Sequence, residues 1–185
     1  MFRFFNKFTL VIFLALFLSL VGLALNEAIE SGGNKGYAPE QPIKYSHKLH
    51  AGELKIPCLY CHYAAEQGRH AGIPPSEVCL NCHKIVKPDS PEIKKIHASV
   101  ESGKPIEWVK VHYYPDFAYF NHSQHVKVGK ISCQECHGPV EKMTVLHQEK
   151  SLRMGWCLDC HRSKGIAPPE DHKSAAGGDC VRCHH

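Results

Sequence analysis

The sequence predicts a mostly irregular domain of short helices and loops that follows one N-terminal membrane helix. Three observations point to this fold class. An almost unbroken apolar run, FTLVIFLALFLSLVGLAL, occupies residues 8–25. All 10 cysteines of the chain fall into five C-x-x-C-H motifs, and none is left over. The roughly 160 residues that follow the run contain too little aliphatic sequence for a protein core of ordinary size.

Residues 1–25 are predicted to be a membrane anchor and residues 26–43 a polar linker. The apolar run is near the lower limit of length for crossing a bilayer. A cleaved signal peptide begins in the same way, but the exit Gly22-Leu-Ala-Leu-Asn-Glu-Ala offers no good A-x-A cleavage site. With Arg3 and Lys7 kept inside, the rest of the chain faces outward. We therefore expect a bacterial cytoplasmic membrane protein with its domain on the periplasmic face.

The C-x-x-C-H motif is the attachment signature of c-type haem. Two thiols a turn apart bond to one macrocycle, and the histidine that follows reaches the iron as proximal ligand. Zinc or disulfides would use the cysteines, but neither requires a histidine after every second one. The sequence thus predicts five covalently bound haem c groups, held by Cys58, Cys61 and His62, by Cys79, Cys82 and His83, by Cys133, Cys136 and His137, by Cys157, Cys160 and His161, and by Cys180, Cys183 and His184.

The domain at residues 44–185 contains an internal repeat. Residues 46–62 and 121–137 both read H-x-x-H, seven residues, then C-x-x-C-H, and they are offset by 75 residues without a gap. Each is followed by a second haem motif. Self-similarity of this kind indicates duplication. We predict two-haem units at residues 44–118 and 119–170, with a fifth haem at residues 171–185.

The duplicated H-x-x-H pairs are predicted to supply four distal iron ligands: His47, His50, His122 and His125. Two histidines three apart point the same general way, but one iron cannot easily take both beside a proximal histidine. The two members of each pair should therefore serve different haems. Surface histidines are the alternative, and the duplication argues against it.

Met143 is the favoured candidate for the fifth distal ligand, and a thioether ligand raises the reduction potential. Met154, His112 and His70 compete with it for this place. The remaining histidines are predicted to lie on the surface: His97, His147, His172 and His185. Because there are enough candidate ligands for every iron, the sequence favours electron transfer over substrate chemistry, and we expect no catalytic site.

The segment between the repeats should begin with a short helix at residues 91–99, with proline near its opening. An aromatic stretch that Pro115 interrupts should follow in extended form. The porphyrins are expected to form the core, so the protein without haem should be largely unfolded. The net charge of +4 is offset by haem propionates, and the lysines are scattered, so no nucleic-acid partner is predicted.

Several of these segments in series resemble the pentahaem cytochrome c subunit, ActA, of bacterial alternative complex III. They are Tyr45-Ser-His-Lys-Leu-His-Ala-Gly, Cys58-Leu-Tyr-Cys-His, Arg69-His-Ala-Gly-Ile-Pro, Phe120-Asn-His-Ser-Gln-His-Val, Cys136-His-Gly-Pro-Val-Glu and Met154-Gly-Trp-Cys-Leu-Asp-Cys-His. The haem part is also similar to multihaem cytochromes of the c3/c7 type. By that likeness His47 would ligate the first haem and His50 a later one.

The resemblance implies an electron-transfer role beside an iron–sulfur subunit, a polytopic quinol-binding subunit and a monohaem cytochrome. Electrons would pass from quinol to a periplasmic cytochrome, a copper protein or a terminal oxidase. The resemblance also implies one His/Met haem among bis-histidine haems, which agrees with Met143 or Met154. Two other readings stay open. One is a stand-alone quinol dehydrogenase of the NapC/NrfH kind, and the other is an enzyme that reduces a small oxyanion at an open haem.

Overall fold

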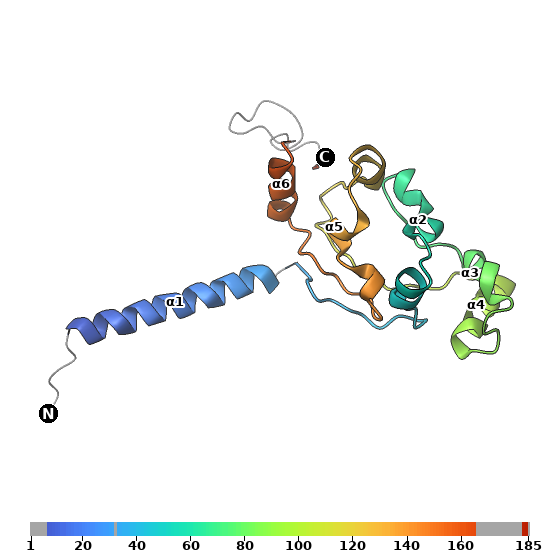
Figure 1. The fold of residues 1–185 in the computed structure, drawn as a ribbon, viewed down its shortest axis with the longest axis horizontal. Helices are drawn as coiled ribbons and strands as arrows, with labels where there is room; N and C mark the ends of the chain where they lie inside the picture. Colours follow the sequence, from blue (N-terminus) through green and yellow to red (C-terminus); the bar gives the residue numbers. More distant parts are fainter. Residues whose placement is uncertain (1–6, 32, 166–182, 185) are drawn as a thin grey trace.

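The computed structural model describes residues 7–31, 33–165 and 183–184 (Figure 1). A long helix, α1 (Lys7–Ser31), projects from a body of short helices joined by irregular segments. The described residues contain no strand. This architecture confirms the predicted fold class of short helices and loops behind one apolar helix.

Helix α1 has the length and composition of a membrane span. The window Thr9–Glu27 has 19 residues and a mean hydropathy of 2.4, and none of it is buried against the body. At 1.5 Å per residue this window is about 29 Å long, close to the thickness of a bilayer's hydrocarbon core. The helix continues to Ser31, so the first part of the predicted linker is helical. Arg3 lies outside the described residues.

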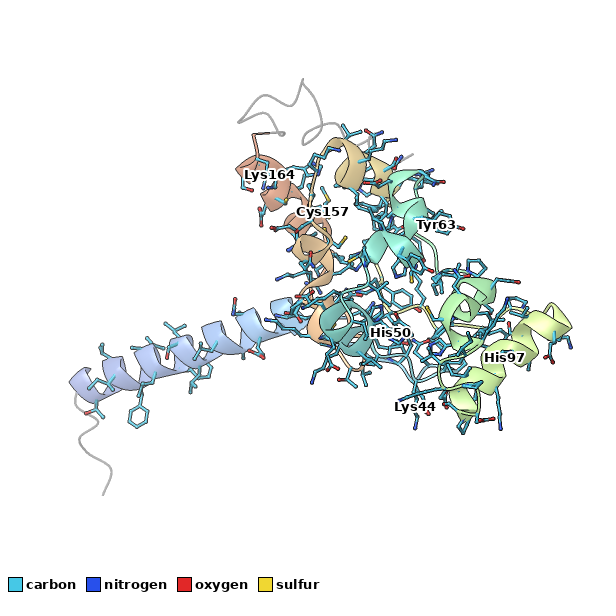
Figure 2. All side chains as sticks on the ribbon, turned by 45° about the vertical axis from the view of Figure 1, so that its right-hand side comes forward. Lys44, His50, Tyr63, His97, Cys157 and Lys164 are labelled. Carbon is cyan, nitrogen blue, oxygen red and sulfur yellow. The ribbon has the colours of Figure 1, made fainter. Side chains whose placement is uncertain are left out.

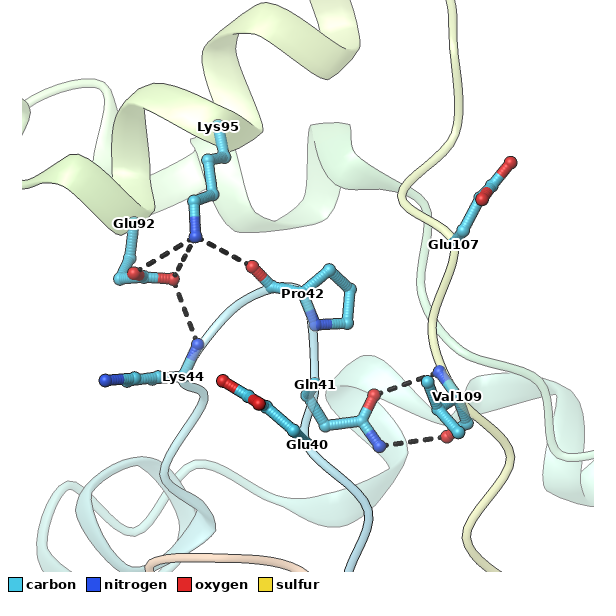
Figure 3. A pocket seen from close by; sticks show the side chains of 8 residues that line it. All are labelled: Glu40, Gln41, Pro42, Lys44, Glu92, Lys95, Glu107 and Val109. Atoms are coloured by element: carbon cyan, nitrogen blue, oxygen red, sulfur yellow. Dashed lines mark hydrogen bonds and ion pairs between the residues drawn. The ribbon is translucent and has the colours of Figure 1, made fainter.

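The rest of the predicted linker is attached along the body. The Gln41 side chain bonds to the backbone of Val109 in both directions, at 2.9 and 3.0 Å (Figure 3). The Lys95 ammonium donates to the carbonyl of Pro42, and the Lys44 backbone nitrogen donates to Glu92. Residues 40–44 therefore follow the surface of the domain instead of holding it away from α1.

One apolar cluster joins α3 (Ser76–His83) to α4 (Pro91–Ser102). Proline opens α4, where its missing N–H costs nothing, and Gly103 ends it at a φ of 65°. The helix predicted at residues 91–99 is confirmed and is three residues longer. The cluster consists of Ile43, Leu80, Ile93 and Ile96.

Few other apolar side chains are buried. Outside the cluster, the buried hydrophobic residues of the described part are Ala65, Val111 and Met143. The short helices therefore do not share a continuous protein core. This agrees with the expectation that the macrocycles supply most of the buried apolar surface.

Short helices carry the predicted haem motifs. The first four motifs lie on α2 (Cys58–Cys61), which His62 directly follows, and on α3, α5 (Cys133–His137) and α6 (Met154–Ser163). Two short 3-10 turns, η2 (Tyr63–Glu66) and η4 (Val140–Lys142), follow α2 and α5. Of the fifth motif, Cys183 and His184 are described, and Cys180 lies outside the described residues.

Candidate haem-binding site

The two H-x-x-H segments have the same backbone geometry. They form π-helical turns, η1 (Lys48–Glu53) and η3 (Gln124–Val128). In the first, the backbone nitrogen of Ile56 donates to the carbonyl of His50 at 3.0 Å. The residues 75 positions later repeat this bond at 3.1 Å. Each turn is followed by a lysine with positive φ, 57° at Lys55 and 52° at Lys130.

Six candidate ligand histidines bond to a backbone carbonyl through Nδ1. Such a bond fixes the ring and leaves Nε2 free for a metal, as is usual for metal-binding histidines. The distances are 2.7 to 2.8 Å for all six. They are His50 to Ser46, His62 to Gly72, His83 to Val86, His122 to Arg69, His125 to Asn121 and His184 to Phe117.

Three pairs of histidine rings have the spacing of axial ligands. With metal–nitrogen bonds of about 2 Å, two imidazoles on opposite sides of one metal ion have ring centres about 6 Å apart. Each observed pair joins an H-x-x-H histidine to a C-x-x-C-H histidine. The ring centres are 6.2 Å apart for His50 and His83, 6.4 Å for His122 and His137, and 6.0 Å for His125 and His161.

The fourth pair follows from the repeat. His47 corresponds to His122, so its counterpart in the first motif is His62. Burial lowers the pKa of His47 to about 4, and His62 is the neighbouring group that contributes most after burial. The ring is therefore neutral at pH 7, the form that binds metals. Its Nδ1 is buried without a hydrogen-bond partner.

The two candidate methionines lie in different surroundings. Met143 is 5% exposed, and its carbonyl accepts a bond from the backbone nitrogen of Lys48 at 2.9 Å. It thus lies beside the turn that begins at His47, not beside the fifth motif. Met154, at the start of α6, is 56% exposed. The identity of the fifth ligand stays a prediction.

Two histidines compete with these methionines. The ring centre of His112 lies 4.4 Å from that of His137 at an angle of 86°, too close for opposite sides of one metal ion. Its Nε2 is buried without a hydrogen-bond partner. His70 follows Arg69, whose guanidinium lies 4.7 Å from the ring centre of Tyr119. The Tyr119 backbone nitrogen donates to the Cys183 carbonyl. The segment around His70 is thus linked through Tyr119 to the fifth motif.

The other histidines have different partners. The Nε2 of His147 lies 3.1 Å from a carboxylate oxygen of Glu149. The Nε2 of His97 lies 3.4 Å from the carbonyl oxygen of His83. These contacts occupy the nitrogens that a metal would need. His172 and His185 lie outside the described residues.

Comparison with known proteins agrees with this geometry. Residues 118–185 match the family described as cytochrome c7 and related cytochrome c. The chain is 38% identical over 165 residues to the multihaem cytochrome c subunit of menaquinone reductase from Nitratidesulfovibrio vulgaris. That alignment covers 78% of this chain and 77% of the relative. The chain belongs to the multihaem cytochrome c family. Covalently bound c-type haem is thus its cofactor class, and the paired rings fit that group.

Sequence reasoning missed an aromatic side chain in each repeat of this multihaem cytochrome. The Tyr45 ring stacks on His50 at 4.3 Å and meets His47 edge-on at 4.8 Å. Seventy-five residues later, Phe120 packs on His125 at 4.4 Å and meets His122 edge-on at 4.8 Å. The signal was present, because the offset that aligns the repeats also aligns these two rings. Each ring holds both distal candidates of its unit in place.

The haem motifs lie next to one another in a defined order. Burial raises the pKa of Cys79, and the neighbouring thiol of Cys61 raises it further. Burial likewise raises the pKa of Cys133, with contributions from the charge of Cys58 and a side-chain hydrogen bond to it. The second motif therefore adjoins the first, and the first adjoins the third.

The order continues toward the C-terminus. Burial raises the pKa of Cys136 to about 11, and Cys160 and Cys157 are the groups that add most to this shift. Burial raises the pKa of Cys157 too, with Cys183 as the largest neighbouring contribution. The third motif thus adjoins the fourth, and the fourth adjoins the fifth. Figure 2 shows Cys157 and His97 at opposite sides of the body.

The cavity in Figure 3 lies apart from these motifs. Its walls carry charged side chains of both signs, and none of its lining residues belongs to a C-x-x-C-H or H-x-x-H segment. A porphyrin needs a mostly apolar surrounding. The cavity marks the place where residues 40–44 meet α4, and it is not a haem site.

Proposed function

We propose that this multihaem cytochrome carries electrons through a row of five c-type haems, as a subunit of a membrane complex that reacts with quinone. The observation that carries the proposal is the set of histidine pairs at axial spacing, each from an H-x-x-H and a C-x-x-C-H segment. We assign His47 with His62, His50 with His83, His122 with His137, and His125 with His161. His184 takes the fifth iron. Of the candidates for its second ligand, Met143 lies beside the turn that begins at His47, whereas the segment around His70 is linked through Tyr119 to the fifth motif.

The polypeptide holds the predicted iron ligands in a fixed orientation and in their neutral form, and both properties favour electron transfer. Haem iron, when bound, supplies reversible one-electron exchange between Fe(III) and Fe(II). Carbonyl bonds at Nδ1 fix the ring orientation, so the ligand set changes little between the two oxidation states. Burial keeps His47 and His137 neutral, with pKa values lowered to about 4 and about 3. Two protein ligands for each iron leave no position open for a substrate.

The name of the relative favours electron flow toward quinone, because that protein is a subunit of a menaquinone reductase. In this reading a soluble donor outside the membrane reduces the row, and the complex passes the electrons to menaquinone. A second reading rests on the likeness to alternative complex III. There electrons run from quinol outward, with an iron–sulfur subunit, a polytopic quinol-binding subunit and a monohaem cytochrome as partners.

The complex purified from membranes tests both readings. Mass spectrometry identifies the subunits that accompany the chain, and a pyridine haemochrome assay counts haem per polypeptide, with five expected. Addition of a menaquinone analogue to the reduced complex should oxidise the haems. Addition of the quinol form to the oxidised complex should reduce them if the outward direction holds. A chain that exchanges electrons with neither form would contradict the proposed function.

A further inference from the structure

We propose that the turn at residues 84–87 is a docking surface for a water-soluble electron-transfer protein whose cofactor edge is rimmed by acidic residues. The inference rests on the proposed function and names the partner at one end of the row. Lys84, Ile85, Val86 and Lys87 form this surface, directly after the second haem motif.

The centre of the surface is apolar and open to water. Ile85 is 85% exposed and Val86 is 52% exposed. No other large hydrophobic side chain among the described residues is as exposed as Ile85. An apolar centre with a polar rim is the usual form of a protein interface.

The rim of the surface is basic. Lys84 and Lys87 flank the apolar pair, and both are exposed. Lys94 lies one turn before His97 on α4, and the His97 side chain reaches the backbone of His83. Asp89 is the acidic residue nearest in sequence. The two lysines that flank the apolar pair favour a partner of opposite charge.

The surface is connected directly to a predicted iron ligand. The carbonyl of Val86 accepts the bond from Nδ1 of His83 at 2.8 Å. Two further bonds, from Ile85 and Val86 to the carbonyl of Cys82, at 3.1 and 2.9 Å, hold the turn against α3. A protein seated on Ile85 would therefore lie within a few residues of the second haem site.

The position along the row agrees with a soluble partner. The second motif adjoins the first, since the Asn81 side chain on α3 donates to the Tyr60 hydroxyl on α2 at 3.0 Å. At the other side of the body, the carbonyl of Gly33, just after α1, accepts a bond from Gln148, which precedes α6 and the fourth motif. In Figure 1 α3 and α4 lie opposite α1. The surface therefore faces away from the membrane side.

The electron balance of the docked state is simple. The soluble carrier would give up one electron to the haem that Cys79 and Cys82 would hold by thioether bonds, and the iron bound by His83 would take it up in passing from Fe(III) to Fe(II). No bond forms or breaks. The reverse transfer, from Fe(II) to an oxidised carrier, balances in the same way.

Flavodoxin, a small acidic electron-transfer protein, is a suitable probe. The purified complex is mixed with flavodoxin hydroquinone at low ionic strength, and haem reduction is followed by stopped flow. Lys84→Glu with Lys87→Glu should lower the second-order rate by on the order of tenfold, with a loss of its salt dependence. Ile85→Ser should weaken binding of oxidised flavodoxin, measured by calorimetry, and should leave the salt dependence unchanged.

The second repeat supplies a matched control. Lys127, Val128 and Lys130 have the same spacing and are also exposed, with Val128 at 68%. Lys127→Glu with Lys130→Glu should leave the affinity for oxidised flavodoxin unchanged. Uncharged reduced lumiflavin should reduce all variants equally, which excludes damage to the haems. Carbodiimide cross-linking followed by mass spectrometry should join flavodoxin carboxylates to Lys84 or Lys87.

Several results would contradict the docking surface. Equal rates in the Lys84/Lys87 variant and the wild type, or cross-links confined to other lysines, would overturn the docking surface. Lack of any binding between flavodoxin and the wild-type complex would overturn it as well. The proposed function is tested separately, by exchange of electrons between the haems and the menaquinone analogue. A complex that passes that test and fails this one keeps the function and loses the docking surface.

Discussion

His47 and His50 are three residues apart and lie near different haem motifs. The Nδ1 bond of His50 to Ser46 orients its ring toward His83, while His62 is the neighbouring side chain that, after burial, lowers the pKa of His47 most. The π-helical turn separates the two rings more than an α-helical turn would, because its bonds span one residue more. On this ground we assign the two histidines to different irons.

We expect His50→Ala to remove the second ligand of one iron. About one iron in five should then give a high-spin signal in the electron paramagnetic resonance spectrum of the oxidised protein. His97→Ala is the control, since its ring bonds only to a backbone carbonyl. A low-spin spectrum that His50→Ala leaves intact would show that His50 is not a ligand.

Tyr45→Leu should loosen both distal histidines of the first unit. Loss of the stacked and edge-on contacts costs about 0.5–1.5 kcal/mol beyond the lost buried area. Reduction potentials of two haems should shift in a redox titration, because Tyr45 contacts both His47 and His50. Tyr45→Phe should behave as the wild type, since the second repeat has phenylalanine at this position. Shifts of equal size in both variants would point to the hydroxyl instead of the ring.

At the scale of elements, η1 and η4 lie so close that only glycine fits between them. A Cβ atom at Gly52 would overlap the carbonyl oxygen of Glu141. The Lys48 nitrogen bonds to the carbonyl of Met143 at the same junction. This contact fixes the turn of the first repeat against the segment that follows the third motif.

Gly52→Ala should therefore separate η1 from η4 and displace His47 and His50. We expect a loss of stability of about 1–3 kcal/mol, typical of overpacking, visible as a lower melting temperature of the holoprotein. Gly155→Ala in α6 is the control, because a Cβ atom there meets nothing within 4 Å. Equal melting temperatures for both variants would contradict the tight junction.

At the scale of the whole molecule, the sequence determined the local features and left the long-range ones open. Covalent attachment fixes the spacing of C-x-x-C-H, so the haem motifs could be predicted directly, and proline marked the start of α4, whereas its end at Ser102 was predicted three residues too early. The neighbours of each motif depend on contacts between distant segments, such as Cys58 with Cys133, which no spacing reveals. For the same reason residues 26–43 were expected only as a polar linker, and the attachment of residues 33–43 to the body was not predicted. The residues that they contact, Val109 and Gln148, lie more than 60 positions later in the sequence.

Removal of haem tests how the whole domain is held together. The buried hydrophobic side chains of the described residues are few, and most join α3 to α4. Protein expressed without the haem-attachment machinery should therefore lose the helical circular dichroism of the domain, apart from that of α1. Proteolysis should cut such protein throughout residues 44–165. Native-like resistance of the haem-free chain would show that the polypeptide folds without the cofactor.

The contact between Cys58 and Cys133 joins the first motif of one unit to the first motif of its duplicate. Two copies joined head to head have their later motifs directed outward, at opposite extremities. A further motif can be added at either extremity without disturbing the contact between Cys58 and Cys133. The fifth motif is one such addition, because it adjoins the fourth. It makes the two ends of the duplicated domain chemically different, so that each end can bind a different partner.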